Sequence, residues 1–261
     1  MNIVVCMKQV PGTTDVKINP QTNTLIRQGI KNIINPFDTY ALEEGVRIKE
    51  RYGGTVKVLS MGPPQAEEML REAISLGADE SILLSDAAFA GADTWATAFT
   101  LAMAIKKMGQ YDLVICGRQT LDGDTGQVGP ELAEMLGIPF VAYVCQIEEV
   151  SEKQARVKRM TDDGYEVIET PLPAVITVTK EINVPRLPSL RGIARSKKAV
   201  IPVWNARELG VDPGGVGLAG SSTRVVKIFF PQRTARAEIF QGELESQVDS
   251  LLAKLKSAGL A

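Results

Sequence analysis

Short apolar runs alternate with helical patterns over the first 145 residues, and this alternation limits the fold more than any other feature of the chain. The first run, residues 2–7, has apolar residues that are continuous rather than alternating, as in strands buried on both faces. Strands that alternate with helices at this spacing form a parallel sheet with helices on both faces. The sequence therefore predicts an α/β fold, with strands at 2–7, 55–61, 81–84, 112–116 and 140–145.

Capping residues and glycines mark the ends of the predicted helices. Asp38 and Asp93 are predicted as N-caps, because a short acidic side chain can accept hydrogen bonds from the free amides of a first helical turn. Gly53 and Gly109 follow helical patterns and are expected to end them. The predicted helices lie at 38–52, about 63–76, 94–108 and 130–136.

The pattern changes after residue 145. The runs 155–160 and 165–169 flank Asp162, Asp163 and Gly164, which indicates a β-hairpin. A further apolar run at 174–179 predicts another strand. An antiparallel addition is therefore expected on the parallel sheet.

The C-terminal third is predicted to be less regular. Residues 185–222 are rich in Pro, Gly, Arg and Lys, and we expect an extended loop that faces a partner. A strand at 224–230 and a helix at 244–255 are expected to follow. We predict one α/β domain over 1–222 and a C-terminal arm over 223–261.

Composition excludes several kinds of site. The chain has no histidine, so it cannot supply a Ser-His-Asp or Cys-His system or a histidine-rich metal site. A net charge of -2 argues against a general nucleic-acid binder. The three cysteines, Cys6, Cys116 and Cys145, form no CxxC motif, and we expect them to be reduced in the cytoplasm. Neither a signal peptide nor a membrane span is expected.

The loop at 117–130, with the sequence GRQTLDGDTGQVGP, is the strongest candidate for a ligand site. It follows a predicted strand, and ligands of parallel sheets bind beyond the carboxyl ends of the strands. Its glycines allow backbone amides to approach a phosphate, and the following helix offers a positive N-terminus. Asp122 and Asp124 are better suited to ribose hydroxyls or to the turn itself. The alternative is an ordinary connecting loop.

Other candidates are weaker. Asp38 ends the segment Asn35-Pro36-Phe37-Asp38, in which Phe37 either stacks on a ring or belongs to the core. Thr94 and Thr97 share one face of a first helical turn and either bind phosphate or simply cap the helix. The basic run 191–198 is either a solvated loop or a docking patch for an acidic partner. The GxGxxG pattern at 215–220 lacks the flanking strand and helix of a dinucleotide site.

Several of these segments together resemble the beta subunit of electron-transfer flavoproteins. They are NIVVCMKQVP at 2–11, NPFDTYALEEGVRIKE at 35–50, SMGPP at 60–64, CGRQTLDGDTGQVGPELAE at 116–134 and the stretch at 157–198. The resemblance covers nearly the whole chain in the same order. It implies a Rossmann-like α/β domain of the adenine-nucleotide alpha-hydrolase type, paired with a larger alpha subunit on which the C-terminal arm packs.

The resemblance also implies a cofactor. Ordinary members bind AMP in the beta subunit, whereas electron-bifurcating members bind a second FAD that accepts hydride from NADH. Those members send one electron to ferredoxin or flavodoxin and the other, through the alpha-subunit FAD, to an acyl-CoA dehydrogenase or similar partner. The motifs GADTWAT at 91–97 and DGDTGQVGPE at 122–131 look like the bifurcating group. Small Thr125 and Gly126 would leave room for FAD.

Residue roles follow from the same motifs. Phe37 would approach the flavin of the alpha subunit, and Leu190 matches the leucine with which the family docks dehydrogenases. Arg191-Gly192 departs from the Pro-Asn of many members, which puts the identity of the partner in doubt. The implied docking residues are Leu190, Arg191, Arg195, Lys197 and Lys198. The implied cofactor residues are Cys6, Asn35, Pro36, Phe37, Asp38, Met61, Thr94, Thr97, Leu113, Gly117, Arg118, Gln119, Thr120, Leu121, Asp122, Gly123, Asp124, Thr125, Gly126, Gln127 and Val128.

Two functions of other classes remain. The same kind of sheet could serve a nucleotide-binding sensor of the universal-stress type, which would act without a partner. A hydrolase or ligase is less favoured, because the chain has neither histidine nor a P-loop.

Overall fold

A computed structural model describes residues 1–12, 17–18, 25–26, 32–226 and 237–260 of the chain. The chain divides into two compact units, Met1–Val226 and Lys227–Ala261, each of which we describe by itself. The boundary falls after 226 rather than after 222 as predicted. Thr223 belongs to the first unit because its backbone amide and its hydroxyl both donate to Asp93, at 2.8 and 3.0 Å.

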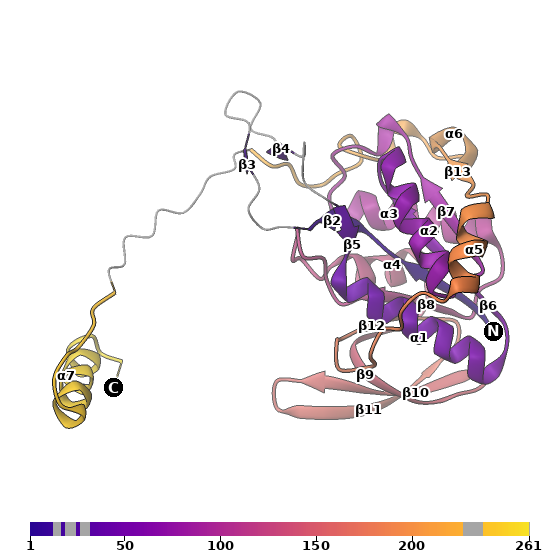
Figure 1. The fold of residues 1–261 in the computed structure, drawn as a ribbon. Helices are drawn as coiled ribbons and strands as arrows, with labels where there is room; N and C mark the ends of the chain where they lie inside the picture. The colour runs from indigo at the N-terminus through magenta and orange to yellow at the C-terminus, as the bar shows by residue number, and fades with distance from the viewer. Residues whose placement is uncertain (13–16, 19–24, 27–31, 227–236, 261) are drawn as a thin grey trace. The chain divides into compact units, whose positions relative to one another are not determined.

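A sheet of nine strands within the described residues forms the centre of the first unit (Figure 1). The strand order is β11-β10-β9-β12-β8-β1-β6-β7-β13, and every pairing from β9 to β13 is parallel. This confirms the predicted α/β fold. The central strands are β1 (Asn2–Cys6), β6 (Thr55–Met61), β7 (Glu80–Leu84), β8 (Leu113–Gly117) and β12 (Ala174–Val178).

Helices cover both faces of this sheet and bury two separate apolar clusters. Helices α1 (Pro36–Tyr52) and α2 (Glu67–Leu76) pack on one face, where Leu42 and Leu70 are fully buried. Helices α3 (Thr94–Met108) and α4 (Val128–Leu136) pack on the other, around Ile105 and Leu132. Two 3-10 turns, η1 (Pro64–Ala66) and η2 (Ala87–Phe89), follow β6 and β7.

The antiparallel addition is confirmed. Strand β9 (Phe140–Val150) begins parallel to β12 and continues antiparallel to β10 (Gln154–Thr161). Its backbone turns at Tyr143, where φ is 57°. Strand β11 (Gly164–Pro171) completes the hairpin as the outer strand, after the turn at Asp162 and Asp163. The hairpin thus extends the parallel sheet on the β9 side.

The prediction of an extended loop over 185–222 is wrong. This stretch contains α5 (Leu190–Lys198), β13 (Val203–Trp204), α6 (Ala206–Leu209) and η3 (Pro213–Gly215). The Ser189 hydroxyl caps α5 by accepting from Gly192 N at 3.0 Å, and Asn205 forms a capping box with Glu208 on α6. Local capping and contacts with the sheet outweigh the loop-like composition.

Other differences are smaller. The strand predicted at 224–230 is absent at residues 224–226, and its remainder lies outside the described residues. Four short strands were not predicted: β2 (Gln9–Pro11), β3 (Lys17–Ile18), β4 (Leu25–Ile26) and β5 (Asn32–Ile34).

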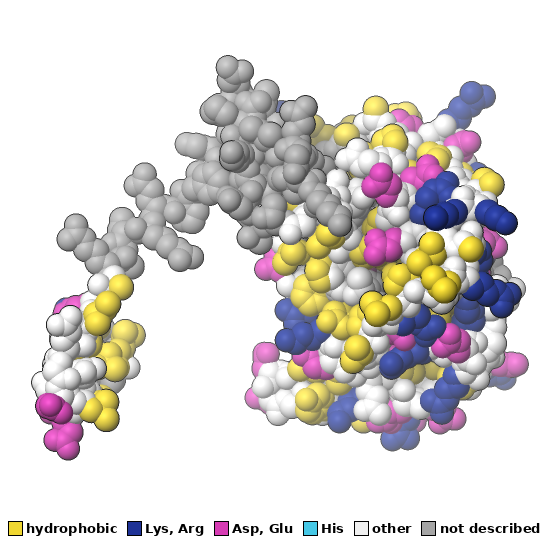
Figure 2. Space-filling model, in the orientation of Figure 1, with side chains coloured by type: hydrophobic (Ala, Val, Ile, Leu, Met, Phe, Trp, Pro, Cys, Tyr) yellow, Lys and Arg dark blue, Asp and Glu magenta, His cyan; other side chains and the backbone are white. Residues whose placement is uncertain are grey.

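The second unit contains helix α7 (Leu244–Ser257), which confirms the predicted C-terminal helix. Its exposed apolar residues Leu244, Val248, Leu251 and Leu252 recur at helical spacing. Figure 2 shows hydrophobic side chains along one side of this helix.

All three cysteines are free, with Cys6 and Cys116 buried and Cys145 half-buried. No helix in the described part of the chain is both long enough and apolar enough to cross a bilayer.

Candidate functional site

A cleft of about 680 Å³ opens at the carboxyl ends of β1, β6 and β8. The N-terminal turns of α3 and α4 form its other walls. This is the edge of the sheet at which open α/β folds bind ligands. A second cleft, of about 690 Å³, lies beside α5 and is lined by Lys57, Lys198 and Trp204. We favour the first cleft as the site, because only it meets the glycine-rich loop and two helix N-termini.

Most of the predicted cofactor residues line this cleft. They are Cys6, Asp38, Met61, Thr94, Thr97, Gly117, Arg118, Gln119, Thr120, Asp122, Gly123, Thr125, Gly126, Gln127 and Val128. Asn35, Pro36, Phe37, Leu121 and Asp124 lie next to these residues in the chain but do not line the cleft.

The prediction of Leu113 as a cofactor residue does not hold. Leu113 is the first residue of β8 and is paired with Ile3, so it lies at the end of the strand opposite Gly117. Its side chain is 1% exposed and belongs to the core.

Asp38 has another role than the predicted N-cap. Helix α1 begins at Pro36 with Asn35 as its N-cap, so Asp38 falls within the first turn. The Asp38 carboxylate is buried and accepts from the backbone amide of Lys8 at 2.7 Å and from Asn35 Nδ2 at 2.9 Å. It therefore connects the first turn of α1 to the end of β1.

Asn35 extends this connection to the glycine-rich loop. Its Nδ2 also donates to the carbonyl of Gln119 at 2.9 Å, and its Oδ1 accepts from the amide of Leu121 at 3.0 Å. Asn35 is fully buried, and leaving either loop group unpaired would carry a desolvation cost of about 1–3 kcal/mol. Asn35 and Asp38 thus determine where the loop begins.

Gly117 permits the closest approach in the site. A Cβ at this position would lie 2.4 Å from Asp38 Oδ1 and 2.8 Å from the carbonyl carbon of Phe37. The backbone at the end of β8 consequently packs directly on the start of α1. The conformation at 117 is not left-handed, so the requirement for glycine here comes from packing.

Lys8 is a site residue that sequence analysis missed. Its Nζ lies 2.8 Å from Asp122 Oδ1, and both residues line the cleft. Asp122, which alone would repel a phosphate, is thereby paired with a cation. The position of Lys8 directly after the first strand was the available signal.

The far wall of the cleft comes from α3 and α4. Asp93 caps α3 by accepting from Ala96 N at 3.0 Å. The Thr94 hydroxyl donates to Glu131 Oε1 at 3.0 Å, which joins the first turns of the two helices. The backbone amides at these two N-termini and the hydroxyls of Thr97 and Thr125 are suited to bind an anion.

Phe37 is partly covered by a neighbour. The Arg118 guanidinium lies 5.3 Å from the centroid of the Phe37 ring and 5.9 Å from that of Tyr143. Both distances suit cation–π contacts. The approach of Phe37 to a second flavin stays a prediction.

Two of the carboxyl groups that line the cleft, Asp38 and Asp122, have pKa values shifted in opposite directions. Burial raises the pKa of Asp38 to about 7, against the opposing hydrogen bonds from Asn35 and Lys8. Burial also acts to raise the pKa of Asp122, but the hydrogen bond and charge of Lys8 outweigh it and lower that pKa.

We expect the raised pKa of Asp38 to appear as a loss of stability with rising pH. The pKa of Asp38 in the folded state exceeds the ordinary value of 3.8. The contribution of Asp38 to the free energy of unfolding is therefore fully present below pH 3.8 and is lost as pH rises through about 7. At 1.36 kcal/mol per unit, the free energy of unfolding should fall by about 2 kcal/mol between about pH 5.5 and 7 through this group. Urea unfolding of wild type and of Asp38→Asn measures it, with Asp163→Asn in the exposed hairpin turn as control. Equal pH slopes in wild type and Asp38→Asn would contradict the assignment.

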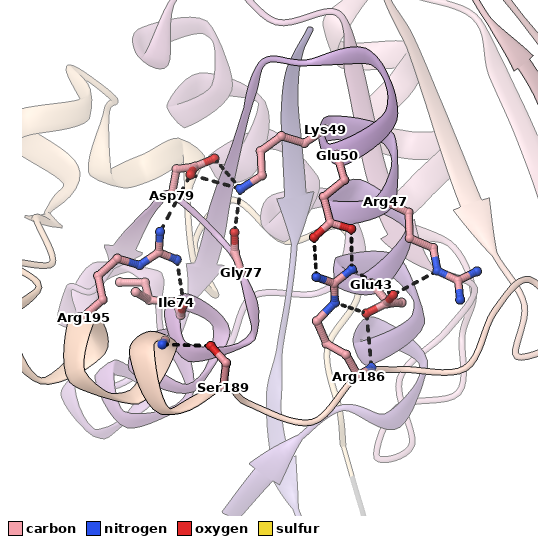
Figure 3. A network of polar contacts seen from close by, with 11 residues as sticks. Glu43, Arg47, Lys49, Glu50, Ile74, Gly77, Asp79, Arg186, Ser189 and Arg195 are labelled. Atoms are coloured by element: carbon pink, nitrogen blue, oxygen red, sulfur yellow. Dashed lines mark hydrogen bonds and ion pairs between the residues drawn. The ribbon is translucent and has the colours of Figure 1, made fainter.

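The predicted docking residues lie on and beside α5. Leu190 is 88% exposed, as is Leu187, and Arg191, Lys197 and Lys198 are also exposed. Figure 2 shows hydrophobic and basic side chains next to each other over this part of the first unit. Arg195 is exposed as well, and its Nη2 donates to the carbonyl of Ile74 at 2.8 Å (Figure 3). The same nitrogen donates to the carbonyl of Ala78 at 2.6 Å.

Arginines hold this surface in place. Arg186 binds Glu43 at 2.8 Å and Glu50 at 2.6 Å on α1 (Figure 3). Arg71 on α2 donates to the carbonyls of Ser196 and Ala199, at 2.9 and 3.0 Å, at the C-terminal end of α5. Arg195 makes the reciprocal contacts at the end of α2. The exposed leucines are thus presented by a segment that is bound to both helices.

Comparisons with known proteins agree on one family. The family model described as "Electron transfer flavoprotein domain" matches residues 22–209. The chain is 52% identical over 258 residues to "Electron transfer flavoprotein subunit beta" of Thermoanaerobacterium thermosaccharolyticum, with 98% of each chain covered.

Two other relatives carry different names. "Caffeyl-CoA reductase-Etf complex subunit CarD" of Acetobacterium woodii is 49% identical over 258 residues, with 98% of each chain covered. "Protein FixA" of Azotobacter vinelandii is 42% identical over 265 residues, covering 98% of this chain and 94% of the relative. Fold, matched family model and full-length identity lead to the same conclusion: the chain belongs to the electron-transfer flavoprotein family, among its beta subunits.

Proposed function

We propose that the cleft at the carboxyl edge of the sheet holds FAD and that the chain serves in electron bifurcation. Family membership implies a flavin or AMP-type nucleotide and an alpha-subunit partner. The cleft volume of about 680 Å³ falls within the usual range for cofactor sites, about 300–1,000 Å³. The observation that carries the proposal is the cleft itself, where the backbone at Gly117 packs closely on the start of α1 and two helix N-termini form a wall.

The extent of the cleft supports FAD over AMP. The lining continues from the loop to Gln65, Phe89 and Gly91, well beyond the segment that would bind one phosphate. At the loop end, Thr125 and Gly126 take little space. Structural AMP, as in ordinary members of the family, is the alternative.

The residues of this chain would bind and orient the cofactor. Lys8 would offset negative charge, and the amides and hydroxyls of the loop would bind the diphosphate. Bound FAD would supply the capacity to accept hydride from NADH and to deliver electrons singly to ferredoxin or flavodoxin and, through the alpha-subunit FAD, to an acyl-CoA dehydrogenase. The Acetobacterium woodii relative is named as a subunit of a caffeyl-CoA reductase-Etf complex, and this supports a partner of this type.

Counting cofactors tests the proposal. The chain is produced together with its alpha subunit, and the FAD and AMP of the purified heterodimer are quantified. Two FAD per heterodimer and bleaching of flavin absorbance by NADH are expected. One FAD with one AMP would instead establish the ordinary carrier, and a stable monomer that binds ATP would favour the universal-stress alternative.

Docking of the dehydrogenase is proposed to depend on Leu190. Truncating an exposed leucine that becomes buried at the centre of an interface should cost about 2 kcal/mol of binding, which exceeds a tenfold change. In Leu190→Ala, electron delivery to an acyl-CoA dehydrogenase is therefore expected to show a KM raised more than tenfold.

Two controls accompany this substitution. Reduction of the flavin by NADH should be unchanged in Leu190→Ala, because Leu190 is not among the residues that line the cleft. Val200→Ala, a change of an equally exposed residue beyond α5, should leave the KM for the dehydrogenase unaltered. Equal KM values for wild type and Leu190→Ala would refute the docking role.

The C-terminal arm is proposed to pack on the alpha subunit. On the apolar side of α7, Leu244, Val248, Leu251 and Leu252 are between 44% and 75% exposed. Exposing such a stripe to water is unfavourable, so we expect another chain to cover it. Loss of heterodimer after removal of residues 237–261 would support this role, and an intact heterodimer would refute it.

A further inference from the structure

A buried carboxyl group lies in the wall of the proposed nucleotide cleft. Asp38 is 4% exposed, yet it is among the residues that line the cleft. Carboxylates are rarely buried without a paired charge, because removing the ion from water is costly. Asp38 therefore differs from Asp122, which is an exposed residue whose carboxylate is bound to Lys8.

The partners of Asp38 are dipoles. Its oxygens accept from the backbone amide of Lys8 at 2.7 Å and from Asn35 Nδ2 at 2.9 Å. The ammonium group of Lys8 pairs with Asp122, and its charge also acts to lower the pKa of Asp38. Hydrogen bonds of this kind stabilise the ionised form, but burial opposes them and leaves the pKa of Asp38 at about 7.

The surrounding titratable groups leave Asp38 as the group that can exchange a proton near neutral pH. Asp93 is another carboxyl that lines the cleft, and there burial is outweighed by the hydrogen bonds from Ala96 and Thr223, which lower the pKa. Cys6 on β1 and Cys116 on β8 are buried beside Asp38, and the pKa of Cys116 is raised by its hydrogen bond with Cys6 and by burial. Lys8 and Asp122 form an ion pair at the mouth of the cleft. Arg118 lies over the ring of Phe37.

A nucleotide would act on Asp38 in two ways. Its phosphates add negative charge to the cleft, and its bulk displaces water from the wall. Both effects disfavour the ionised carboxylate. We propose that Asp38 takes up a proton when an anionic nucleotide enters the cleft, so that nucleotide binding is linked to pH. This inference rests on the proposed function only in so far as the cleft binds a nucleotide.

The direction of the linkage follows. A ligand whose binding is accompanied by proton uptake binds more tightly as pH falls. For uptake of one proton, affinity changes by at most about tenfold per pH unit, and it should change most around the pKa of Asp38. Nucleotide affinity is therefore expected to weaken as pH rises from about 6 to 8.

Calorimetry of the heterodimer tests the inference. The nucleotide is first removed from this cleft, and FAD is titrated in at about pH 7 in phosphate and in Tris, buffers with very different ionisation enthalpies. The difference in binding enthalpy gives the number of protons taken up. FAD is the primary probe because its diphosphate diester does not titrate near neutral pH. AMP is the second probe.

Two variants assign the proton. In Asp38→Asn, uptake should disappear together with the dependence of affinity on pH. Glu131→Gln is the matched control, since Glu131 is a second partly buried carboxyl near the cleft whose pKa is raised by burial, and there uptake should persist. Should Asp38→Asn fail to fold, infrared difference spectra of the wild type decide the question, through a carboxylic-acid band that appears on FAD binding and shifts with ¹³C-aspartate.

The outcomes separate this inference from the proposed function. Binding of FAD without proton uptake, uptake that survives in Asp38→Asn, or uptake that is lost in Glu131→Gln would each overturn the role of Asp38 and leave the FAD proposal standing. Uptake with AMP that disappears in Asp38→Asn, together with no binding of FAD, would support Asp38 and refute FAD. Binding of neither nucleotide would refute both.

Discussion

Replacing Gly117 with alanine is expected to abolish retention of the nucleotide and to lower the free energy of unfolding by up to about 3 kcal/mol, the usual upper cost of overpacking. The added Cβ would lie 2.4 Å from Asp38 Oδ1 and 2.8 Å from the backbone of Phe37, so either β8 or the start of α1 must move. The Asn35 hydrogen bonds to the loop would be broken by the same movement, because they span the two segments.

The measurement is direct. Nucleotide content of the purified heterodimer and its thermal midpoint are compared for wild type, Gly117→Ala and Gly215→Ala. Gly215 is the control outside the lining of the cleft, because a Cβ there meets only the ring of Phe99, at 3.9 Å. If Gly117→Ala retains a full complement of nucleotide and an unchanged midpoint, close packing at this glycine does not shape the site.

Removing the side chain of Arg186 should also lower the free energy of unfolding. Glu43 is 5% exposed and accepts from Arg186 Nε at 2.8 Å, and Glu50 accepts from Nη1 at 2.6 Å (Figure 3). Only Glu43 is buried, since Arg186 is 32% and Glu50 54% exposed. Arg47 still pairs with Glu43 in Arg186→Ala, so we expect a loss of about 2 kcal/mol, as for lost hydrogen bonds to a charged group.

Arg47→Ala is the control for this prediction. Arg47 is 48% exposed, and its removal leaves the contacts of Arg186 with Glu43 intact, so the loss should stay below about 1 kcal/mol. Urea unfolding measures both variants. Hydrogen exchange of residues 184–199 should also accelerate in Arg186→Ala only, because this arginine holds the segment that leads into α5. Comparable losses in the two variants would show that the pair with Arg186 is not the dominant one.

Local patterns in the sequence predicted most of the scaffold. Continuous apolar runs, glycines after helices and the Asp-Asp-Gly turn reflect preferences that act over a few residues, and the structure has strands, helices and the hairpin where they fall. The same reasoning failed over 185–222, where Pro, Gly and basic residues suggested a loop. There Ser189 and Asn205 provide caps, and contacts with α2 and β7 stabilise α5 and β13.

Composition and pattern also predicted which loop forms the candidate site. They did not predict the contacts within that site. The glycine-rich segment after β8 was identifiable because parallel strands place their ligand loops at one edge. Sequence pattern could not show that Lys8 pairs with Asp122, 114 residues away, or that Asn35 binds Gln119 and Leu121. Such contacts depend on which strands become neighbours.

The sequence by itself determined that this chain forms a parallel α/β sheet with a glycine-rich ligand loop, and its motifs determined the family. Only the tertiary structure decided which way the polar side chains face. In the structure, Asp38 is a buried carboxyl in the cleft wall instead of the predicted N-cap, and Arg195 donates to a carbonyl at the end of α2. The physical reason is the range of the forces: backbone preferences act between neighbours in sequence, whereas burial and charge pairing act between groups that folding alone brings together.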